Sequence, residues 1–486
     1  MPPKNCKTMK NQSETNTRPP IDAEIARIAD YVHDYSPTDN ALATARLCLM
    51  DSIACALMAQ AYPACTRHLG PVVAGADFAD GVRVIGTTFR LDPIKAAFDN
   101  GALICWLDFN DTWLAAEWGH PSDNLGAIWA VGDYLSQRAS SGKPLLADIL
   151  AFMIKAHEIQ GVLALANSFN RVGLDHVALV KVASSAVSTA MLGGGREQTM
   201  AAISHAFADG QSLRVYRHAP NTGSRKSWAA GDAASRGVKL AIMALAGEEA
   251  IPAALSAKTW GLYDVSFGGR PFVLERDYGS YVMENILFKV SYPAEFHAQT
   301  AVECAVRLHP LVAGRLNEIT RVCIDTQASA VRIISKSGKL YNSADRDHCI
   351  QYMTAIGLIF GELNAEHYED AVAADERIDI IRGKMEISEN PCYSRDYMDP
   401  EKRSIANAVQ VFFADGSKTE KIAMEYPLGH KKRRAESIPF LQAKFDGALD
   451  AVFPAPRRAA INALFADEAC LCQTPMRDFV TLFTAD

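Results

Sequence analysis

The sequence predicts a mainly α-helical protein whose second half contains a smaller α/β domain. The 486 residues exceed what a single hydrophobic core normally serves, so two domains are expected. From residue 21 to about residue 285 the chain consists of long Ala-rich stretches with apolar residues at helical spacing and short polar breaks. After Phe288 the pattern changes to alternating apolar and polar side chains, which is typical of strands.

Residues 41–60 show the helical pattern of the first part. Apolar residues recur there at steps of three or four, at Leu42, Ala45, Leu49 and Ile53. Alanine and cysteine fill neighbouring positions, which lets helices approach one another closely. The segment is therefore predicted to be a buried helix.

The strands of the second part are predicted from alternation and from one turn. Residues 319–326 alternate apolar and polar side chains, and so do residues 409–413. The second run is followed by an Asp-Gly pair at 415–416 and then by apolar positions within 422–424. An Asp-Gly pair between two such runs predicts a β-hairpin.

Composition limits the classes of partner. The formal net charge is -7 and the sequence pI is about 6.0, so the chain lacks the basic surface that attracts a nucleic-acid backbone or an anionic membrane. No apolar run is expected to reach the roughly 20 residues of a membrane span. We therefore expect a protein that acts on a small molecule and binds neither nucleic acid nor membrane.

Residues 1–20 are predicted to form a disordered tail. They contain four prolines and many Asn, Thr and Lys residues, with almost no apolar side chains to bury. A mitochondrial presequence would be rich in arginine, whereas this stretch contains only Arg18. The cytoplasm is the expected location, and the mitochondrial matrix remains the alternative.

The cysteine pattern indicates a reduced protein without a metal site. Most of the 11 cysteines lie inside apolar runs, as Cys48, Cys55 and Cys105 do, where cysteine behaves as a small hydrophobe. No Cys-x-x-Cys sequence occurs, and the pair at 470 and 472 lacks a second pair of ligands. Glycine motifs for phosphate or dinucleotide binding are missing as well. We expect no metal and no cofactor, so side chains must carry out any chemistry.

Residues 108–124 are the most informative segment of the chain. They contain four acidic residues, two tryptophans and one histidine between long apolar runs. Such a segment is expected to be too polar for the core and too aromatic for an ordinary loop. Polar groups beside large rings are typical of a small-molecule site, because the rings exclude water while the polar groups orient and protonate a substrate. A solvated connection between helices, anchored by its tryptophans, is the alternative.

As a whole, this segment resembles the signature of the MmgE/PrpD family, which contains the 2-methylcitrate dehydratases and cis-aconitate decarboxylase. The resemblance covers roughly residues 22–450. Beyond the signature it continues through residues 155–161, 167–176, 216–223, 225–232, 278–285, 292–297 and 344–352.

The resemblance implies the architecture in more detail. A large helical domain over residues 21–284 would be followed by a smaller α/β lid domain over residues 285–429. Residues 430–486 would then return to the helical domain, so that the lid is an insertion. The family also implies a homodimer.

Carried over position by position, the resemblance implies six catalytic residues. Structural alternatives exist: His120 could cap a helix, Asp108 could be only a helix N-cap, and Thr112 could lie on a helix surface. Lys289 interrupts an apolar run, and because a buried ammonium without a partner is costly, it must reach solvent or face an anion. The six residues are Asp108, Thr112, His120, His176, Lys226 and Lys289.

Five further residues are weaker candidates for substrate contacts. Arg225, beside Lys226 at a predicted helix start, could meet a carboxylate, or the pair could form a solvated turn. The other four could line the cleft or equally brace loops. His157 is expected to be structural, because histidines on helix faces commonly find a local partner. The five candidates are Arg217, His218, Arg225, His297 and His348.

The reaction that the resemblance implies is dehydration of 2-methylcitrate to 2-methyl-cis-aconitate, a step of the methylcitrate cycle in propionate catabolism. An iron–sulfur cluster is one way to dehydrate a citrate-like acid, but its ligand spacing is missing here. His120, positioned by Asp108 and Thr112, would act as acid or base, with His176 or a lysine as its partner. Two lysines would hold carboxylates of the tricarboxylate substrate.

Three alternatives remain open at this point. They are dehydration of a longer alkylcitrate in a fungal natural-product pathway, decarboxylation of cis-aconitate, and an inactive homologue that only binds tricarboxylates. The interval from the Thr-Trp pair at 112–113 to His120 resembles that of the dehydratases, since the interval in the decarboxylase is shorter. Every charged residue of the signature is present, which favours an enzyme over an inactive homologue. Three glycines at 193–195 depart from the dehydratase pattern without bearing on the reaction class.

Overall fold

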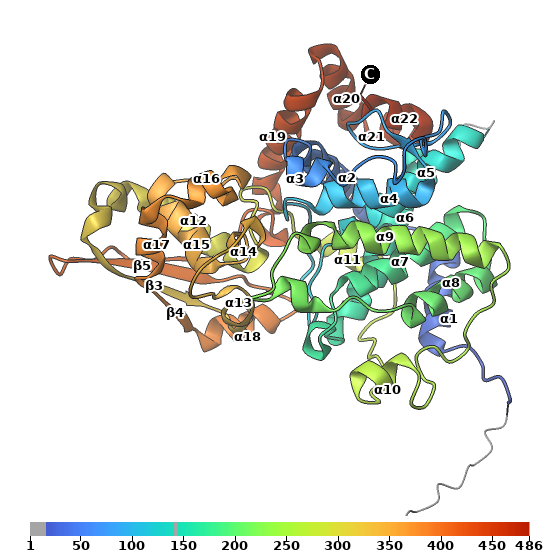
Figure 1. Cartoon of the computed structure of the whole chain (residues 1–486), viewed down its shortest axis with the longest axis horizontal. Helices are drawn as coiled ribbons and strands as arrows, with labels where there is room; N and C mark the ends of the chain where they lie inside the picture. Colours follow the sequence, from blue (N-terminus) through green and yellow to red (C-terminus); the bar gives the residue numbers. More distant parts are fainter. Residues whose placement is uncertain (1–15, 140–143, 486) are drawn as a thin grey trace, which may run out of the picture.

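The computed structural model describes residues 16–139 and 144–485. Of the predicted tail, residues 1–15 lie outside the described residues, and residues 16–20 are exposed chain without regular structure. The chain forms a large helical body from which a smaller domain with a β-sheet projects to one side (Figure 1). The expected mainly helical fold with a smaller α/β domain is confirmed.

The helical body is built from closely packed helices. Gly231 of α9 faces α4, where a Cβ atom would lie 2.4 Å from the carbonyl oxygen of Phe98, so only glycine allows this approach. The close packing fixes the start of α9, from which Lys226 extends. The helices are α1 (Ala23–Asp34), α2 (Asp39–Ala59), α3 (Pro63–Thr66), α4 (Pro93–Cys105), α5 (Leu125–Arg138), α6 (Leu146–Ala166), α7 (Val177–Met191), α8 (Arg196–Ala208), α9 (Arg225–Leu245), α10 (Leu262–Phe267) and α11 (Tyr281–Asn285).

The buried helix expected at residues 41–60 is present as α2. By length and composition, α2 and α6 could each cross a membrane, so the expectation that no segment approaches such a length was wrong. Most of the apolar stretch of each helix is buried within the fold, 72% in α2 and 83% in α6. Both helices therefore belong to the core of the helical body.

A short antiparallel ribbon interrupts the helices and was not predicted. It pairs β1 (Val82–Arg83) with β2 (Arg90–Leu91). Two-residue strands are too short for alternation to be recognised in a sequence. The ribbon is anchored by Arg83, whose Nη2 lies 2.5 Å from Oδ1 of Asp133 on α5.

The lid domain contains a four-stranded sheet in the order β4-β3-β5-β6. The predicted strand at residues 319–326 is β3, which pairs in parallel with β4 and antiparallel with β5. The predicted hairpin is formed by β5 and β6, and Gly416 in its turn has a φ of 84°. The strands are β3 (Ile319–Thr326), β4 (Met385–Glu389), β5 (Asn407–Phe413) and β6 (Ile422–Met424).

Helices cover the lid sheet (Figure 1). Helices α12 and α15 pack together on one face, and α12 contacts both β5 and β6. The helices of the lid are α12 (Gln299–Val312), α13 (Ala328–Ile334), α14 (Ser343–Arg346), α15 (Ile350–Phe360), α16 (Asp370–Ala373), α17 (Glu376–Arg382) and α18 (Pro391–Met398).

After the lid, the chain returns to the helical body. Helix α19 packs along α2 and carries Lys444, whose side chain is buried. Its Nζ donates to Oδ1 of Asp51 at 2.7 Å, to the carbonyl oxygen of Phe109 at 2.7 Å and to that of Lys289 at 3.1 Å. The helices of this part are α19 (Arg434–Val452), α20 (Ala455–Ala466), α21 (Glu468–Gln473) and α22 (Met476–Leu482).

Two separate apolar cores correspond to the two parts of the molecule. The core of the helical body draws on residues between 25 and 290 and between 441 and 483. The core of the lid draws on residues between 287 and 413, joined by Leu114 and Trp118 from the signature segment. This segment therefore contributes side chains to both parts and lies at the junction between them.

Candidate active site

The signature segment, residues 108–124, is buried rather than solvated. Asp111, Glu117 and Asp123 are all fully buried, so the expectation that the segment is too polar for the core was wrong. Their carboxylates accept hydrogen bonds, for example Asp111 from the hydroxyl of Ser122 at 2.6 Å and Glu117 from the backbone N–H of Asn170 at 2.7 Å. Polar groups can occupy a core when partners are supplied in this way.

Backbone hydrogen bonds hold the middle of this segment rigidly. The N–H of Thr112 donates to the carbonyl of Leu287 at 2.7 Å, and the N–H of Leu287 donates back at 3.0 Å. Trp113 and Gly119 exchange a similar pair of bonds at 2.8 and 3.1 Å. The side chains between residues 112 and 119 therefore project from a fixed backbone.

Asp108 is the centre of a buried network of charges. Its backbone is in the left-handed region, with a φ of 49°. Nζ of Lys289 ion-pairs with Oδ1 of Asp108, and Nζ of Lys226 lies 3.2 Å from Oδ2. Burial alone would raise the pKa of Asp108, but the two ammonium groups outweigh burial and hold this pKa well below its usual range. Asp108 is therefore an ionised carboxylate, not only a helix cap.

The two lysines of the site have different surroundings. Lys289 is fully buried and also donates to the carbonyl oxygen of Asp108 at 2.7 Å, so the requirement that it face an anion is met. Nζ of Lys226 lies between two carboxylates, because Oδ2 of Asp347 is 2.7 Å away. Asp347 belongs to the lid and Lys226 to the helical body, so this ion pair joins the two parts.

The orientation and tautomer of His120 are set by a backbone carbonyl. Nδ1 of His120 lies 2.5 Å from the carbonyl oxygen of Asp111, which can only accept, so Nδ1 carries the proton. The hydroxyl of Thr112 is more distant from Nδ1, at 3.5 Å, and Oδ1 of Asp108 lies 3.5 Å from Nε2. Burial, followed by the charge of Lys289, lowers the pKa of His120 to about 3. The ring is therefore neutral at pH 7, with an unprotonated Nε2.

Asp111 is held in place by the buried side chain of His157. Nε2 of His157 lies 2.8 Å from Oδ2 of Asp111, and Nδ1 of His157 lies 2.8 Å from the carbonyl oxygen of Met153. His157, expected to be structural, thus fixes the residue whose carbonyl orients His120.

His176 faces His120 across the site. The two rings meet edge to face, with centroids 5.8 Å apart. Gly119 permits this approach, because a Cβ atom there would lie 3.0 Å from the ring of His176. Nδ1 of His176 lies 3.0 Å from Oδ1 of Asp175, but both ring nitrogens are buried without a hydrogen-bond partner of suitable geometry among the described residues. Burial, joined by the charges of Arg217 and Arg214, lowers the pKa of His176 and outweighs the opposite effect of Asp175.

Asp175 also gathers two arginines at this end of the site. Nε of Arg217 lies 2.7 Å from Oδ2 of Asp175, and Nη1 of Arg214 lies 3.1 Å from Oδ1. Nε of Arg214 and Nη2 of Arg217 are buried without hydrogen-bond partners among the described residues. Two guanidinium groups thus share one carboxylate and retain free donors.

These groups surround a small cavity, here named the central cavity, with a volume of about 20 Å³. The volume is that open to the centre of a water molecule, and roughly 10–15 Å³ of such space holds one water, so the cavity is far too small for a tricarboxylate. A tricarboxylate can enter only if the lid and the helical body move apart. The central cavity is lined by Asp108, Thr112, Leu114, Trp118, Gly119, His120, His176, Arg214, Arg217, Lys289, Glu295, Phe296 and His348.

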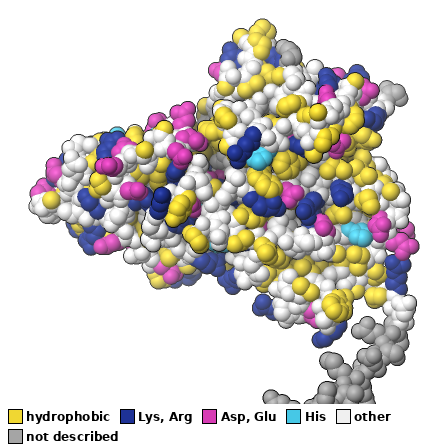
Figure 2. All heavy atoms as spheres, viewed as in Figure 1, with side chains coloured by type: hydrophobic (Ala, Val, Ile, Leu, Met, Phe, Trp, Pro, Cys, Tyr) yellow, Lys and Arg dark blue, Asp and Glu magenta, His cyan; other side chains and the backbone are white. Residues whose placement is uncertain are grey.

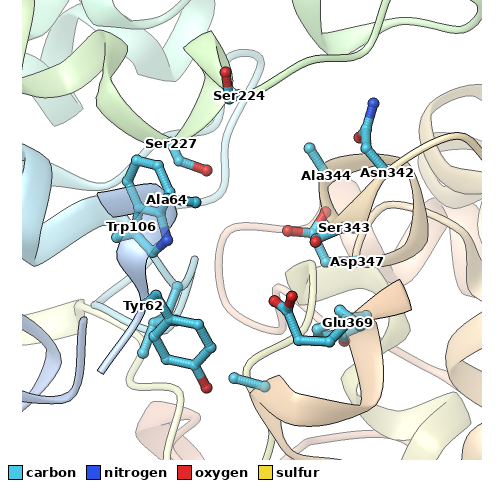
Figure 3. A pocket seen from close by; sticks show the side chains of 13 residues that line it. Tyr62, Ala64, Trp106, Ser224, Ser227, Asn342, Ser343, Ala344, Asp347 and Glu369 are labelled. Carbon is cyan, nitrogen blue, oxygen red and sulfur yellow. The ribbon is translucent and has the colours of Figure 1, made fainter. Parts of the chain in front are cut away.

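A larger cavity of about 330 Å³, here named the outer cavity, lies on the far side of the ion pair between Lys226 and Asp347. Figure 3 shows Tyr62, Trp106 and Ser227 of the helical body on one side of it. Asn342, Ser343, Asp347 and Glu369 of the lid face them from the other side. The outer cavity therefore follows the boundary along which the two parts would separate.

The positively charged side chains of the site are buried and do not form part of a charged area on the protein surface. On the face shown in Figure 2, basic and acidic side chains are interspersed with apolar ones, without a large area of one sign. Lys226, Lys289 and Arg217 are each at most 5% exposed. An anion reaches their charges only inside the molecule, where Coulomb interactions are less screened than in water.

Seven of the eleven residues predicted from the sequence line the central cavity. They are Asp108, Thr112, His120, His176, Arg217, Lys289 and His348. Lys226 does not line the cavity, but its Nζ ion-pairs with Asp108, which does.

The other three predicted residues lie elsewhere. Arg225 ion-pairs with Asp232 at 3.0 Å and lies over the ring of Trp228. His218 is outside the lining of the cavity, and Nδ1 of His297 lies 2.6 Å from Glu295. His297 therefore braces a lining residue without lining the cavity itself.

Sequence reasoning missed Arg214, Asp175, Glu295 and Asp347 as parts of the site. Asp175 and Asp347 each precede a predicted histidine directly, and that adjacency was an available signal. Nδ1 of His348 indeed lies 2.8 Å from Oδ1 of Asp347. Arg214 stands in a short 3₁₀ turn without any motif of its own.

Two groups of side chains bring three potential metal ligands close together among the described residues. They are Cys48 with Asp111 and His157, and Asp108 with Asp347 and His348. In the second group the ammonium of Lys226 occupies the position between the carboxylates. In the first, His157 already provides a partner for Asp111.

The fold and the site define a class of protein: a helical body with an inserted α/β lid, whose junction buries imidazoles and cations in a form suited to acid–base chemistry on an anionic small molecule. Residues 26–275 match the MmgE/PrpD N-terminal domain and residues 292–467 match the MmgE/PrpD C-terminal domain. The chain belongs to the MmgE/PrpD family.

Curated relatives align with nearly the whole chain. A 2-methylcitrate dehydratase of Cupriavidus necator is 55% identical over 98% of this chain and 100% of its own length. A 2-methylcitrate dehydratase of Salmonella typhimurium is 56% identical over 97% of this chain and 99% of its own. A relative of Yarrowia lipolytica named "2-methylcitrate dehydratase, mitochondrial" is 54% identical over 90% of this chain and 86% of its own.

Proposed function

We propose that this protein is a hydro-lyase that dehydrates 2-methylcitrate to 2-methyl-cis-aconitate without a cofactor. The observation that carries the proposal is the neutral, tautomerically fixed ring of His120, whose free Nε2 stands in a cavity also lined by Lys289, Arg214 and Arg217. Such a cavity provides a base for a proton beside a carboxylate and cations for the charge that develops. The names of the relatives supply the substrate.

In the proposed reaction, His120 removes the proton from the methyl-bearing carbon. Its pKa of about 3 describes the site without substrate. The carboxylates of a bound substrate favour the protonated ring and so raise this pKa, which makes Nε2 a stronger base in the complex. The electron pair of the broken C–H bond becomes the new C=C bond.

The hydroxyl on the neighbouring carbon leaves as water after it receives a proton. His176 is proposed as the donor, because its buried Nε2 has no hydrogen-bond partner in the part of the chain that the structure describes and its ring faces His120. Burial holds the pKa of His176 below its usual value in the site without substrate, and Asp175, 3.0 Å from Nδ1, together with the carboxylates of a bound substrate favours the imidazolium form needed for this role.

The carboxylates of the substrate are assigned to two groups of cations. Arg214 and Arg217 line the cavity and each has a nitrogen without a hydrogen-bond partner among the described residues, and Lys289 lines the same cavity beside Asp108. Lys226 becomes available to a substrate carboxylate when the lid, which carries Asp347, moves away. Closure over the bound substrate then excludes water.

The same proposal includes the assembly and location of the enzyme. It acts as a homodimer in the methylcitrate cycle of propionate breakdown, in the cytoplasm or in the mitochondrial matrix. The word "mitochondrial" in the name of the Yarrowia relative supports the second location. Measurement of the molar mass in solution tests the dimer.

Absorbance near the ultraviolet edge tests the reaction, because the product contains a conjugated alkene. Protein treated with EDTA is mixed with 2-methylcitrate, and with citrate in parallel. Absorbance that grows faster with 2-methylcitrate supports the proposal. A flat signal with both acids, from protein that shows a cooperative unfolding transition, overturns it.

A further inference from the structure

Three apolar side chains face the central cavity among otherwise polar groups. They are Leu114, Trp118 and Phe296, and they belong to the apolar core of the lid. The remaining lining side chains carry charge, a hydroxyl or an imidazole, apart from Gly119. A substrate with three carboxylates and one hydroxyl has a single apolar part, its alkyl substituent, and burial of that part against polar groups is unfavourable.

The position of the methyl substituent on the substrate indicates which of the three apolar side chains lie near it. The methyl group of 2-methylcitrate stands on the carbon that loses its proton, so it must lie beside Nε2 of His120. Leu114 and Trp118 come from the same rigid backbone segment as His120. Trp118 is held in place, because the guanidinium of Arg214 lies 5.2 Å from its ring, that of Arg332 lies 5.6 Å away and His297 meets it edge to face.

Leu114 differs from Trp118 and Phe296 because a second cavity lies behind it. It also lines a second cavity, here named the side cavity, which has a volume of about 10 Å³ and mostly apolar walls. Leu287 and Trp113 form part of these walls. Trp118 and Phe296 do not line the side cavity. Leu114 is thus the side chain shared by the two cavities.

We infer that Leu114 sets the length of the alkyl substituent that the enzyme accepts, by closing the central cavity off from the side cavity. The inference rests on the proposed dehydration and specifies its substrate range. With leucine the site receives a methyl group. A smaller residue joins the two cavities, so that a longer alkyl chain extends past position 114 toward Leu287. A larger residue fills the place of the methyl group itself.

The test compares kcat/KM for citrate, 2-methylcitrate, 2-ethylcitrate and 2-propylcitrate in the wild type and three variants. Leu114→Ala is expected to raise the ratio of the propyl to the methyl substrate by at least about tenfold, the size of effect that a single methylene has in a fitted pocket. Leu114→Phe is expected to shift preference the other way, toward citrate. Leu287→Ala is the matched control, because Leu287 lines only the side cavity and Leu114 still closes it off.

The outcomes separate this inference from the proposed function. Absence of turnover with 2-methylcitrate in the folded wild type overturns the dehydratase proposal itself. Wild-type turnover combined with an unchanged preference in both Leu114 variants overturns the inference alone. If Leu114→Ala does not fold, Leu114→Val decides, since it removes one methylene from the same side chain. A Leu287→Ala variant that accepts the propyl substrate as well as Leu114→Ala does would also contradict the role of position 114.

Discussion

The carbonyl oxygen of Asp111 lies 2.5 Å from Nδ1 of His120, and this one contact determines which ring nitrogen can act as a base. A carbonyl only accepts hydrogen bonds, so the proton stays on Nδ1 and Nε2 faces the central cavity unprotonated. Asp111 is itself fixed by Ser122 and His157. In the proposed mechanism the basic nitrogen is thus selected by backbone geometry, and the buried side chains of Ser122 and His157 hold that backbone in place.

Replacement of His120 by alanine is expected to reduce kcat by about 10²- to 10⁴-fold, the usual contribution of a general base. The thermal unfolding temperature should change little, because the ring is neutral and lines a cavity. His218→Ala is the control, because His218 lies nearby but outside the lining of the cavity. Steady-state kinetics and a melting curve check both variants, and equal losses of activity in the two would count against the assignment.

Lys226→Met is expected to lower both stability and activity. It leaves the buried carboxylates of Asp108 and Asp347 without a shared cation, and removal of one partner of a buried ion pair costs about 3–5 kcal/mol of unfolding free energy. The neighbouring Arg225→Met removes a charge that is partly exposed and should cost less than about 1 kcal/mol. Urea unfolding measures the difference, and similar midpoints for the two variants would contradict the buried network.

The acid side of the pH profile should differ between kcat/KM and kcat. Protonation of His120 removes the base, so activity falls as pH decreases. In the free enzyme the pKa of His120 is about 3, so it should produce no acid limb in kcat/KM above about pH 5. Substrate carboxylates raise the pKa in the complex, so the limb in kcat should lie at higher pH. Profiles corrected for ionisation of the substrate test this, and coinciding limbs between pH 6 and 7 would show that the free ring is not held neutral.

Glu117→Gln should change how stability depends on pH. Burial raises the pKa of Glu117 to about 7, above its ordinary value of 4.5, although Arg214 acts in the opposite direction. The folded state therefore binds a proton that the unfolded state has lost, and wild-type stability decreases as pH rises from 4.5 to about 7. Glutamine removes this dependence, by an amount on the order of 3 kcal/mol. Denaturant unfolding at pH 5 and pH 7.5 checks it, and parallel losses in variant and wild type would refute it.

Gly231→Ala tests the packing that fixes the start of α9. The added Cβ would lie 2.4 Å from the carbonyl oxygen of Phe98, so the helices must shift, at a cost of about 1–3 kcal/mol. Gly210→Ala is the control, since no atom lies within 4 Å of the position of its Cβ. Thermal unfolding should separate the two variants, and equal melting temperatures would show that α4 and α9 can move apart freely.

Local sequence patterns were sufficient to predict those helices and strands whose residues all follow one pattern. The apolar periodicity of residues 41–60 predicted α2, and the Asp-Gly turn predicted the hairpin of β5 and β6. The two-residue strands of the ribbon carry no such pattern. The apolar stretches of α2 and α6 were underestimated because their few polar residues interrupt runs without lowering the average hydropathy enough to matter.

Residues of the site could be predicted from the sequence where they stand in a family motif and carry a suitable chemical group. They could not be predicted where their position depends on partners far along the chain. His120 and Lys289 both line the central cavity, while their catalytic roles stay predictions. The burial of Glu117 depends on Asn170 and Arg214, which lie far along the chain, so its polar segment was wrongly taken as unsuited to a core. Arg214 was missed for the same reason, because only the folded chain brings it to Asp175.

Lys444, near the end of the chain, contacts residues beside the candidate site that come from much earlier in the sequence. Its ammonium is the cation that Asp51 meets at 2.7 Å, and it also holds the backbone of Phe109 and Lys289 on either side of Asp108. During synthesis on the ribosome, Lys226, Lys289 and the histidines of the candidate site are made long before Lys444. Burial raises the pKa of Asp51 to about 6 even with Lys444 present, so without Lys444 that carboxylate would have to remain in water or take up a proton. The contacts of Lys444 with Asp51, Phe109 and Lys289 can therefore form only after α19 has been synthesised, so this side of the candidate site is completed late in synthesis.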